Sequence, residues 1–108
     1  MKKTRAYTEE ETRRMFIEYL WSILGECLTD KRMKTPQHKL EVFMHSTLAM
    51  MDGSAINLPG FLVIPNPHPD DKAYHQKHGE NYFKKVDIGG CLHEMMYQYK
   101  PKSIPDRD

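Results

Sequence analysis

The sequence has few of the features that would point directly to a function. Its 108 residues include two cysteines, Cys27 and Cys91, which lie in apolar helical patterns rather than in closely spaced pairs, so we predict no disulfide framework. No apolar run approaches the ~20 residues that cross a bilayer. The basic N-terminal stretch has no apolar segment behind it, so no secretory signal is expected. These features predict a soluble, cytoplasmic protein without a membrane partner.

The chain also lacks an excess of charge of one sign. Sixteen Lys and Arg residues against fifteen Asp and Glu residues give a formal net charge of +1. A dedicated nucleic-acid-binding domain carries a basic excess on one face, so nucleic acid is not the expected partner. A weaker hypothesis combines basic residues with aromatic stacking, and its residues are Lys31, Arg32, Lys34, Tyr82, Phe83, Lys84 and Lys85.

The length bounds the architecture. A chain of 108 residues buries enough surface for one core. We therefore predict a single domain over residues 1–108, with frayed tails at 1–7 and 101–108, where apolar content is low.

Two helices are predicted in the first half. Residues 8–28 begin with a Thr-x-x-Glu capping box. Apolar side chains then recur at the spacing of one helical face, at Met15, Phe16, Tyr19, Leu20, Ile23, Leu24, Cys27 and Leu28. Thr35 is the predicted N-cap of the second helix, which begins at Pro36, runs to about Met51 and stops at Asp52 and Gly53. We expect an antiparallel helical hairpin. The predicted inner face of the second helix contains Leu40, Phe43, Met44, Leu48 and Met51.

The second half mixes strand and helix signals. Residues 61–64 are apolar and bounded by prolines, which is typical of a short buried strand, and residues 82–86 are expected to pair with them in a two-stranded β ribbon. Residues 69–78 carry signals for a short helix, and Asp87 is expected to cap a last helix over residues 88–100. The predicted fold class is therefore α+β and mainly helical.

The segment PNPHPDDKAYHQKHGE, residues 65–80, is rich in metal-ligand side chains. On a helix, Asp71, His75 and His78 project from one face, and such a set can bind zinc or another divalent ion. This interpretation gives a metal-binding protein, and even a hydrolase with His68 or Glu80 as acid or base. The same spacing is typical of a solvated helix face, and both interpretations stay open.

Other polar residues have a structural interpretation beside a functional one. The glycines of DIGGCLHE favour either an anion at a helix start or close packing. We expect Cys91 in the core, turned away from His93, because residues two apart do not face each other on a helix. His45 is either buried against a backbone carbonyl or faces His93 and Glu94. Asp52 is expected to bond its own turn.

Ile17 and Trp21 lie four residues apart and off the main apolar face of the first helix. They form a second apolar patch that needs another element or another subunit. Together with the lack of a strong catalytic motif, this patch favours a non-enzymatic protein–protein interaction module that self-associates, for example as a homodimer. We name no catalytic or cofactor-binding residue, and a divalent metal is the one cofactor considered.

Four stretches, LAMMDGS, LPGFLVIPNPHPDDKAYH, GENYF and DIGGCLHE, resemble a group of uncharacterised small proteins encoded in bacterial and phage genomes. They span about half of the chain, from the second predicted helix to the last. The resemblance implies a phage-related or mobile-element setting in a bacterial cytoplasm. It implies no activity, cofactor or site residue.

Overall fold

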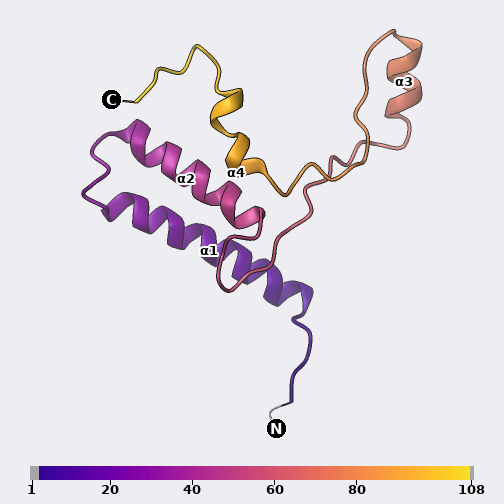
Figure 1. Ribbon diagram of the computed structural model, residues 1–108. Helices are drawn as coiled ribbons and strands as arrows, with labels where there is room; N and C mark the ends of the chain where they lie inside the picture. The colour runs from indigo at the N-terminus through magenta and orange to yellow at the C-terminus, as the bar shows by residue number, and fades with distance from the viewer. Residues whose placement is uncertain (1–2, 108) are drawn as a thin grey trace.

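The computed structural model describes residues 3–107, and its regular structure there is helical (Figure 1). The elements in chain order are α1 (Glu9–Thr29), α2 (Pro36–Met51), α3 (Asp71–Lys77), α4 (Leu92–Met95) and a 3-10 helix, η1 (Tyr97–Tyr99). The predicted hairpin is confirmed: α1 and α2 pack side by side, and α4 contacts α2. Helix α3 lies at the tip of an arm, residues 64–86, that projects from these helices (Figure 1).

The ends of α1 and α2 follow the local signals of the sequence. The Thr8 hydroxyl accepts from the Glu11 amide and the Glu11 carboxylate accepts from the Thr8 amide, which completes the capping box. The Thr35 hydroxyl likewise caps α2. Gly53, with φ 99°, ends α2 in the left-handed region, where glycine is favoured.

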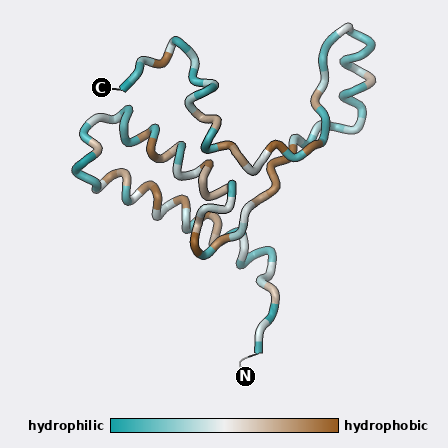
Figure 2. The backbone as a smooth tube through the Cα atoms, in the orientation of Figure 1, coloured by the Kyte–Doolittle hydropathy of each residue, from teal (hydrophilic) through white to brown (hydrophobic). Residues whose placement is uncertain are grey.

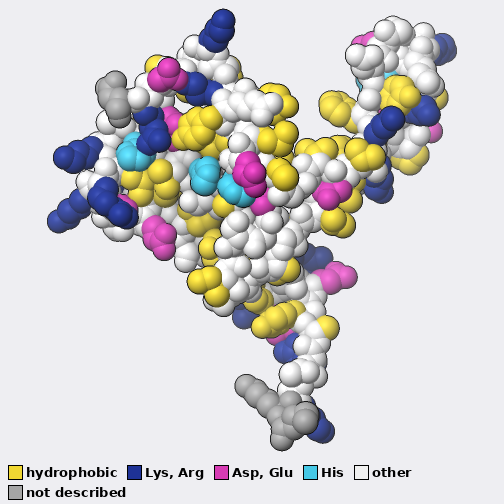
Figure 3. Space-filling model, in the orientation of Figure 1, with side chains coloured by type: hydrophobic (Ala, Val, Ile, Leu, Met, Phe, Trp, Pro, Cys, Tyr) yellow, Lys and Arg dark blue, Asp and Glu magenta, His cyan; other side chains and the backbone are white. Residues whose placement is uncertain are grey.

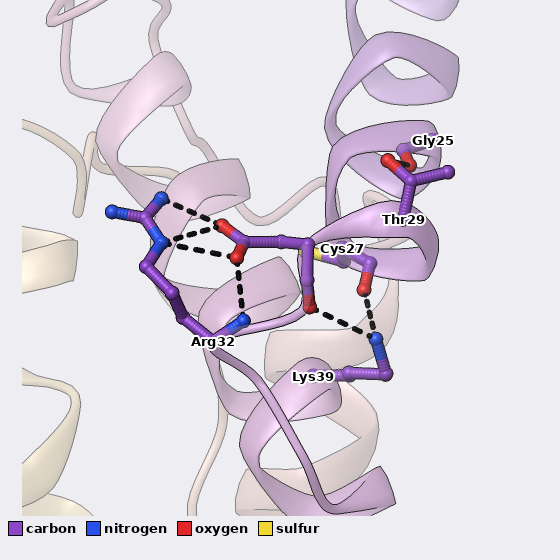
Figure 4. A network of polar contacts seen from close by, with 6 residues as sticks. Gly25, Cys27, Thr29, Arg32 and Lys39 are labelled. Carbon is purple, nitrogen blue, oxygen red and sulfur yellow. Dashed lines mark hydrogen bonds and ion pairs between the residues drawn. The ribbon is translucent and has the colours of Figure 1, made fainter.

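A lysine from α2 stabilises the end of α1. The last turn of α1 contains no basic residue. Lys39 Nζ donates instead to the carbonyl oxygen of Cys27 at 2.7 Å (Figure 4) and to that of Leu28 at 3.3 Å. These carbonyls have no partner within the helix, and a cation is favourable there. Beside them, Arg32 pairs with Asp30 at 2.6 Å. The loop between the helices is thereby held in one arrangement.

The core is small and lies between α1, α2 and the loop that follows α2. Among residues 3–107, the buried apolar side chains fall in two clusters, one of Ile23, Cys27 and Met33 and one of Met50, Ala55 and Leu58. None of the described residues after Leu58 is buried. The second half of the chain therefore lies on the first without extending its core.

The predicted inner face of α2 is only partly right. Phe43 packs on the buried cluster at α1, together with Val42, and Met51 packs on the other cluster. Leu40 and Met44 are exposed and line a groove with the C-terminal segment. Helix α2 thus has two apolar faces, whereas the sequence pattern predicted a single one.

The predicted α+β fold class is wrong, because residues 3–107 contain no β-strand. The Val63 carbonyl, in the first ribbon segment, accepts from the amide of Ile88, two residues beyond the second segment, at 2.7 Å. The Val63 amide, however, donates to the Asp87 carboxylate at 2.8 Å rather than to a backbone carbonyl. A β ladder needs successive backbone bonds, and the prolines that flank residues 61–64 have no amide hydrogen to donate.

The prediction of one continuous helix over residues 88–100 is also wrong. Gly90 has φ 104°, which a right-handed helix does not allow, so α4 begins only at Leu92. Asp87 does not cap it, because its carboxylate bonds the amides of Val63 and Gly89. Cys91, expected in the core, is exposed. The C-terminal part is therefore two short helical turns rather than one packed helix.

The resulting molecule is flat and open. Its extents are 52 × 52 × 19 Å and its radius of gyration is 18.3 Å, whereas a compact domain of about 100 residues has a radius near 13 Å. Hydrophobic residues are spread along the helices and extended segments rather than gathered at one centre (Figure 2). Many of them are exposed, along the arm and around α4 (Figure 3).

Candidate functional site

An apolar groove with a volume of about 810 Å³ lies between α2 and the C-terminal segment, residues 88–105. One wall is formed by Leu40, Met44 and Leu48 of α2. The other wall carries Leu92, Met95, Met96, Tyr99 and Ile104. Methionine side chains are flexible and polarisable and suit adaptable binding surfaces. The arrangement can therefore hold an apolar side chain or helix.

A buried carboxylate holds one end of the groove together. The Asp52 side chain is 2% exposed, and its oxygens accept from the Gly90 amide at 3.1 Å and the His93 amide at 2.9 Å. Its Oδ2 atom also lies 2.5 Å from His93 Nδ1. Burial raises the pKa of the Asp52 carboxyl, but these hydrogen bonds outweigh burial and leave the pKa below its ordinary value. Asp52 thus caps α4 and fixes it to the end of α2.

The bond also fixes the role of one imidazole nitrogen. An ionised carboxylate only accepts hydrogen bonds, so His93 Nδ1 is the donor in this contact. The His45 ring lies edge-on to the His93 ring with centroids 5.4 Å apart. Of the two positions that the sequence left open for His45, the structure has the one facing His93. The expectation that Asp52 bonds its own turn is wrong, because its carboxylate bonds Gly90 and His93.

Glu41 holds the other end of the groove. It accepts from the Tyr97 hydroxyl at 3.0 Å and pairs with Arg107 Nε at 3.2 Å. One turn earlier, Gln37 Nε2 donates to the Pro105 carbonyl at 2.5 Å. Burial raises the pKa of the Glu41 carboxyl, while the bonds from Gln37 and Tyr97 lower it to below its ordinary value. Residues 101–107, expected as a frayed tail, lie along α2 through these contacts.

A second apolar surface lies on α1. Ile17 is 52% and Trp21 67% exposed, and Leu24 and Leu28 continue the same row at i, i+4, i+7 and i+11. We call these four residues the α1 ridge. The sequence pattern assigned Leu24 and Leu28 to the core face, yet Leu28 is exposed and Leu24 packs on neither buried cluster. A Cβ added at Gly25 would meet no atom within 4 Å, so the helix is also open beside the ridge.

The predicted metal ligands lie on α3 or at its end, each with a partner of its own. Asp71 Oδ2 accepts from the His68 amide at 3.0 Å, His75 Nδ1 lies 3.4 Å from Glu80 Oε1, and His78 Nδ1 lies 2.8 Å from the Tyr74 carbonyl. Residues 3–107 contain no group of three His, Cys, Asp or Glu side chains arranged to hold a metal. The ligand set stays a prediction, and in this conformation its members do not converge.

The residues of the nucleic-acid hypothesis fall in two separate places. Three of the basic residues lie in the loop between α1 and α2, and the other four residues lie in the arm, at a different end of the molecule (Figure 1). Arg32 is paired with Asp30. The two groups therefore form no continuous basic surface.

Comparison with family models, with curated proteins and with solved structures gives no match. The resemblance to small phage and bacterial proteins therefore stays a sequence-based interpretation. Within residues 3–107, the helices are too short or too polar to cross a membrane.

Proposed function

We propose that the chain is a non-enzymatic interaction protein that self-associates through the α1 ridge. The proposal retains the patch of Ile17 and Trp21 inferred from the sequence and extends it along α1 to Leu24 and Leu28. It gives the chain a structural role, in which the assembled copies rather than one copy form the working unit.

The observation that carries the proposal is the surface that one copy leaves exposed. The chain exposes 9398 Å², whereas a compact monomer of 108 residues exposes about 6,200 Å². A specific interface covers about 800 Å² of each partner, so the excess is several times the area of one interface. Removal of apolar surface from water contributes about 25 cal/mol per Å², which favours a neighbour on these side chains.

The ridge has the composition of an interface centre. Tryptophan is enriched among the residues that dominate binding energies, because it buries a large area with few rotatable bonds. The spacing of four, three and four residues from Ile17 to Leu28 is that of a coiled-coil seam. Charged side chains of α1, Arg14 and Glu18, lie next to the ridge in the helix and supply a polar rim.

Replacement of Trp21 by Asp tests the proposal. The substitution puts a charge at the centre of the ridge, and Trp21 is not part of either buried cluster, so the fold is expected to persist. A hot-spot residue contributes about 2 kcal/mol or more, so we expect association to weaken at least about 30-fold in sedimentation velocity. Ile56→Asp is the matched control, because Ile56 is 97% exposed and lies in the loop after α2.

The proposal fails if the wild-type protein sediments as a monomer at every concentration. It also fails if Trp21→Asp and Ile56→Asp associate equally well, since the ridge would then carry no special contact. Circular dichroism on both variants verifies that the helices are retained.

A further inference from the structure

The groove between α2 and the C-terminal segment is an apolar surface that the chain builds but does not fill. Leu40, on its α2 wall, is 68% exposed. The Asp52–His93 and Glu41–Tyr97 contacts hold the two walls at a fixed separation, so the groove exists before any occupant arrives. An occupant therefore spends little free energy on ordering it.

The α1 ridge of the same copy cannot reach the groove. At 100° per residue, Ile17 and Trp21 lie about 120° and 160° around α1 from Ile23, which packs towards α2. Met44 and Leu48 lie about 100° and 140° around α2 from Phe43, which packs towards α1. Each surface thus faces away from the other helix, and only a second copy can bring them together.

The exposed area favours a second copy as the occupant. The chain exposes 9398 Å², which exceeds the compact value by about 3,000 Å², enough for two standard surfaces of about 800 Å² on each copy. A contact of ridge with ridge would cover one surface and leave the groove exposed. A contact of ridge with groove covers both surfaces with a single type of interface.

The two surfaces also match in length and charge. The stretches from Ile17 to Leu28 and from Gln37 to Leu48 each contain twelve residues, with an axial rise of about 16 Å from first to last. The charged groups at the groove already have partners in their own chain. Glu41 contacts Tyr97 and Arg107, and Lys100 forms an ion pair with Asp106. An apolar helix entering the groove therefore does not bury an unpaired charge, which would be costly.

From these features we infer that the groove of one copy receives the α1 ridge of the next copy. The inference rests on the proposed self-association and names the surface that the ridge contacts. A contact between two different surfaces is heterologous, and its repetition from copy to copy closes a ring or extends a filament.

Mixing of two variants tests the inference. Trp21→Asp damages the ridge and leaves the groove intact, whereas Leu40→Asp damages the groove and leaves the ridge intact. We expect each variant alone to associate at least about 30-fold more weakly than the wild type. An equimolar mixture is expected to form a one-to-one heterodimer, because the intact ridge of one variant fits the intact groove of the other. Native mass spectrometry identifies this species when one variant is isotope-labelled.

Tyr99→Asp provides a second groove variant on the opposite wall. Tyr99 is exposed and belongs to η1, so its substitution leaves the hairpin untouched, and we expect it to behave like Leu40→Asp in both measurements. Ile56→Asp again serves as the control and is expected to associate like the wild type.

Three results would overturn the inference. If both groove variants associate like the wild type while Trp21→Asp does not, the ridge contacts a surface other than the groove. If Phe83→Asp in the arm is the variant that prevents association, the arm is the contact instead. If the mixture contains no heterodimer, the two surfaces do not meet. A monomeric wild type would remove the proposed function itself, which is a different outcome from these three.

Discussion

The contact between Asp52 and α4 gives the most quantitative prediction. Asp52 accepts three hydrogen bonds, from the Gly90 amide, the His93 amide and the His93 ring, at 3.1, 2.9 and 2.5 Å. Each such bond contributes about 1 kcal/mol net, and bonds to a charged group more, but amides freed by substitution can bond water. For Asp52→Ala we therefore expect the C-terminal segment to open more easily by about 2 kcal/mol. Asp52→Asn keeps one acceptor oxygen, so its loss is expected to be about half as large.

Amide hydrogen exchange measures this opening directly. A loss of about 2 kcal/mol accelerates exchange at Gly90 and His93 about 30-fold, if exchange proceeds through local opening. The measurement uses the Trp21→Asp background, so that association does not protect the amides. Asp70→Asn is the matched control, because the exposed Asp70 makes no side-chain bond to α3. Equal exchange at the two amides in Asp52→Ala and the control would refute the assigned role of Asp52.

Three further predictions concern glycine, pH and metal. Gly53→Ala is expected to lower the free energy of unfolding by more than about 1 kcal/mol, because φ is 99° and the new Cβ would lie 3.2 Å from Gly60 Cα. Gly25→Ala is expected to raise the free energy of unfolding of the monomer by about 1 kcal/mol, because its Cβ would lie in open space on a helix. Thermal unfolding measures both changes. The ion pair with Arg5 and the Thr8 amide lower the pKa of Glu11 from about 4.5 to about 2, so its stabilisation is complete above pH 4.5 and lost as the pH falls towards 2; acid titration of Glu11→Gln should lack this component. If the α3 segment binds a divalent ion, His75→Ala abolishes its retention, and elemental analysis that finds equal metal in both proteins excludes His75 as a ligand.

The parts of the fold that the sequence predicted are those set by neighbouring residues. The capping box of Thr8 and Glu11 and the glycine end of α2 involve partners within a few positions. Such contacts form whenever the helix forms, so the helix bounds could be read closely from the sequence.

The parts that the sequence missed depend on distant partners. Asp52 and His93 are 41 residues apart, and Asp87 bonds an amide 24 residues earlier. No spacing rule predicts such a pair. The Asp87 bond takes the Val63 amide that a β ladder would have used, and the Asp52 bonds replace the predicted cap of α4. The groove could not be predicted for the same reason. The apolar residues of α2 were assigned to one face, whereas α1 contacts some of them and the C-terminal segment contacts others.

The residues of the α1 ridge likewise differ in how well the sequence alone identifies them. Ile17 and Trp21 could be recognised from the helical period alone, since they fall outside the main apolar face. Leu28 could not, because its position fits both the core face and the ridge, and only the packing of α2 shows that it is exposed.

A native mass spectrum of the untagged wild-type protein, purified without a chelator, tests the central claim most directly. It reports the number of subunits and any bound metal in one measurement. Self-association through the exposed apolar surface predicts species of two or more copies whose abundance rises with concentration and falls in Trp21→Asp. A single-copy species at every concentration would contradict the account.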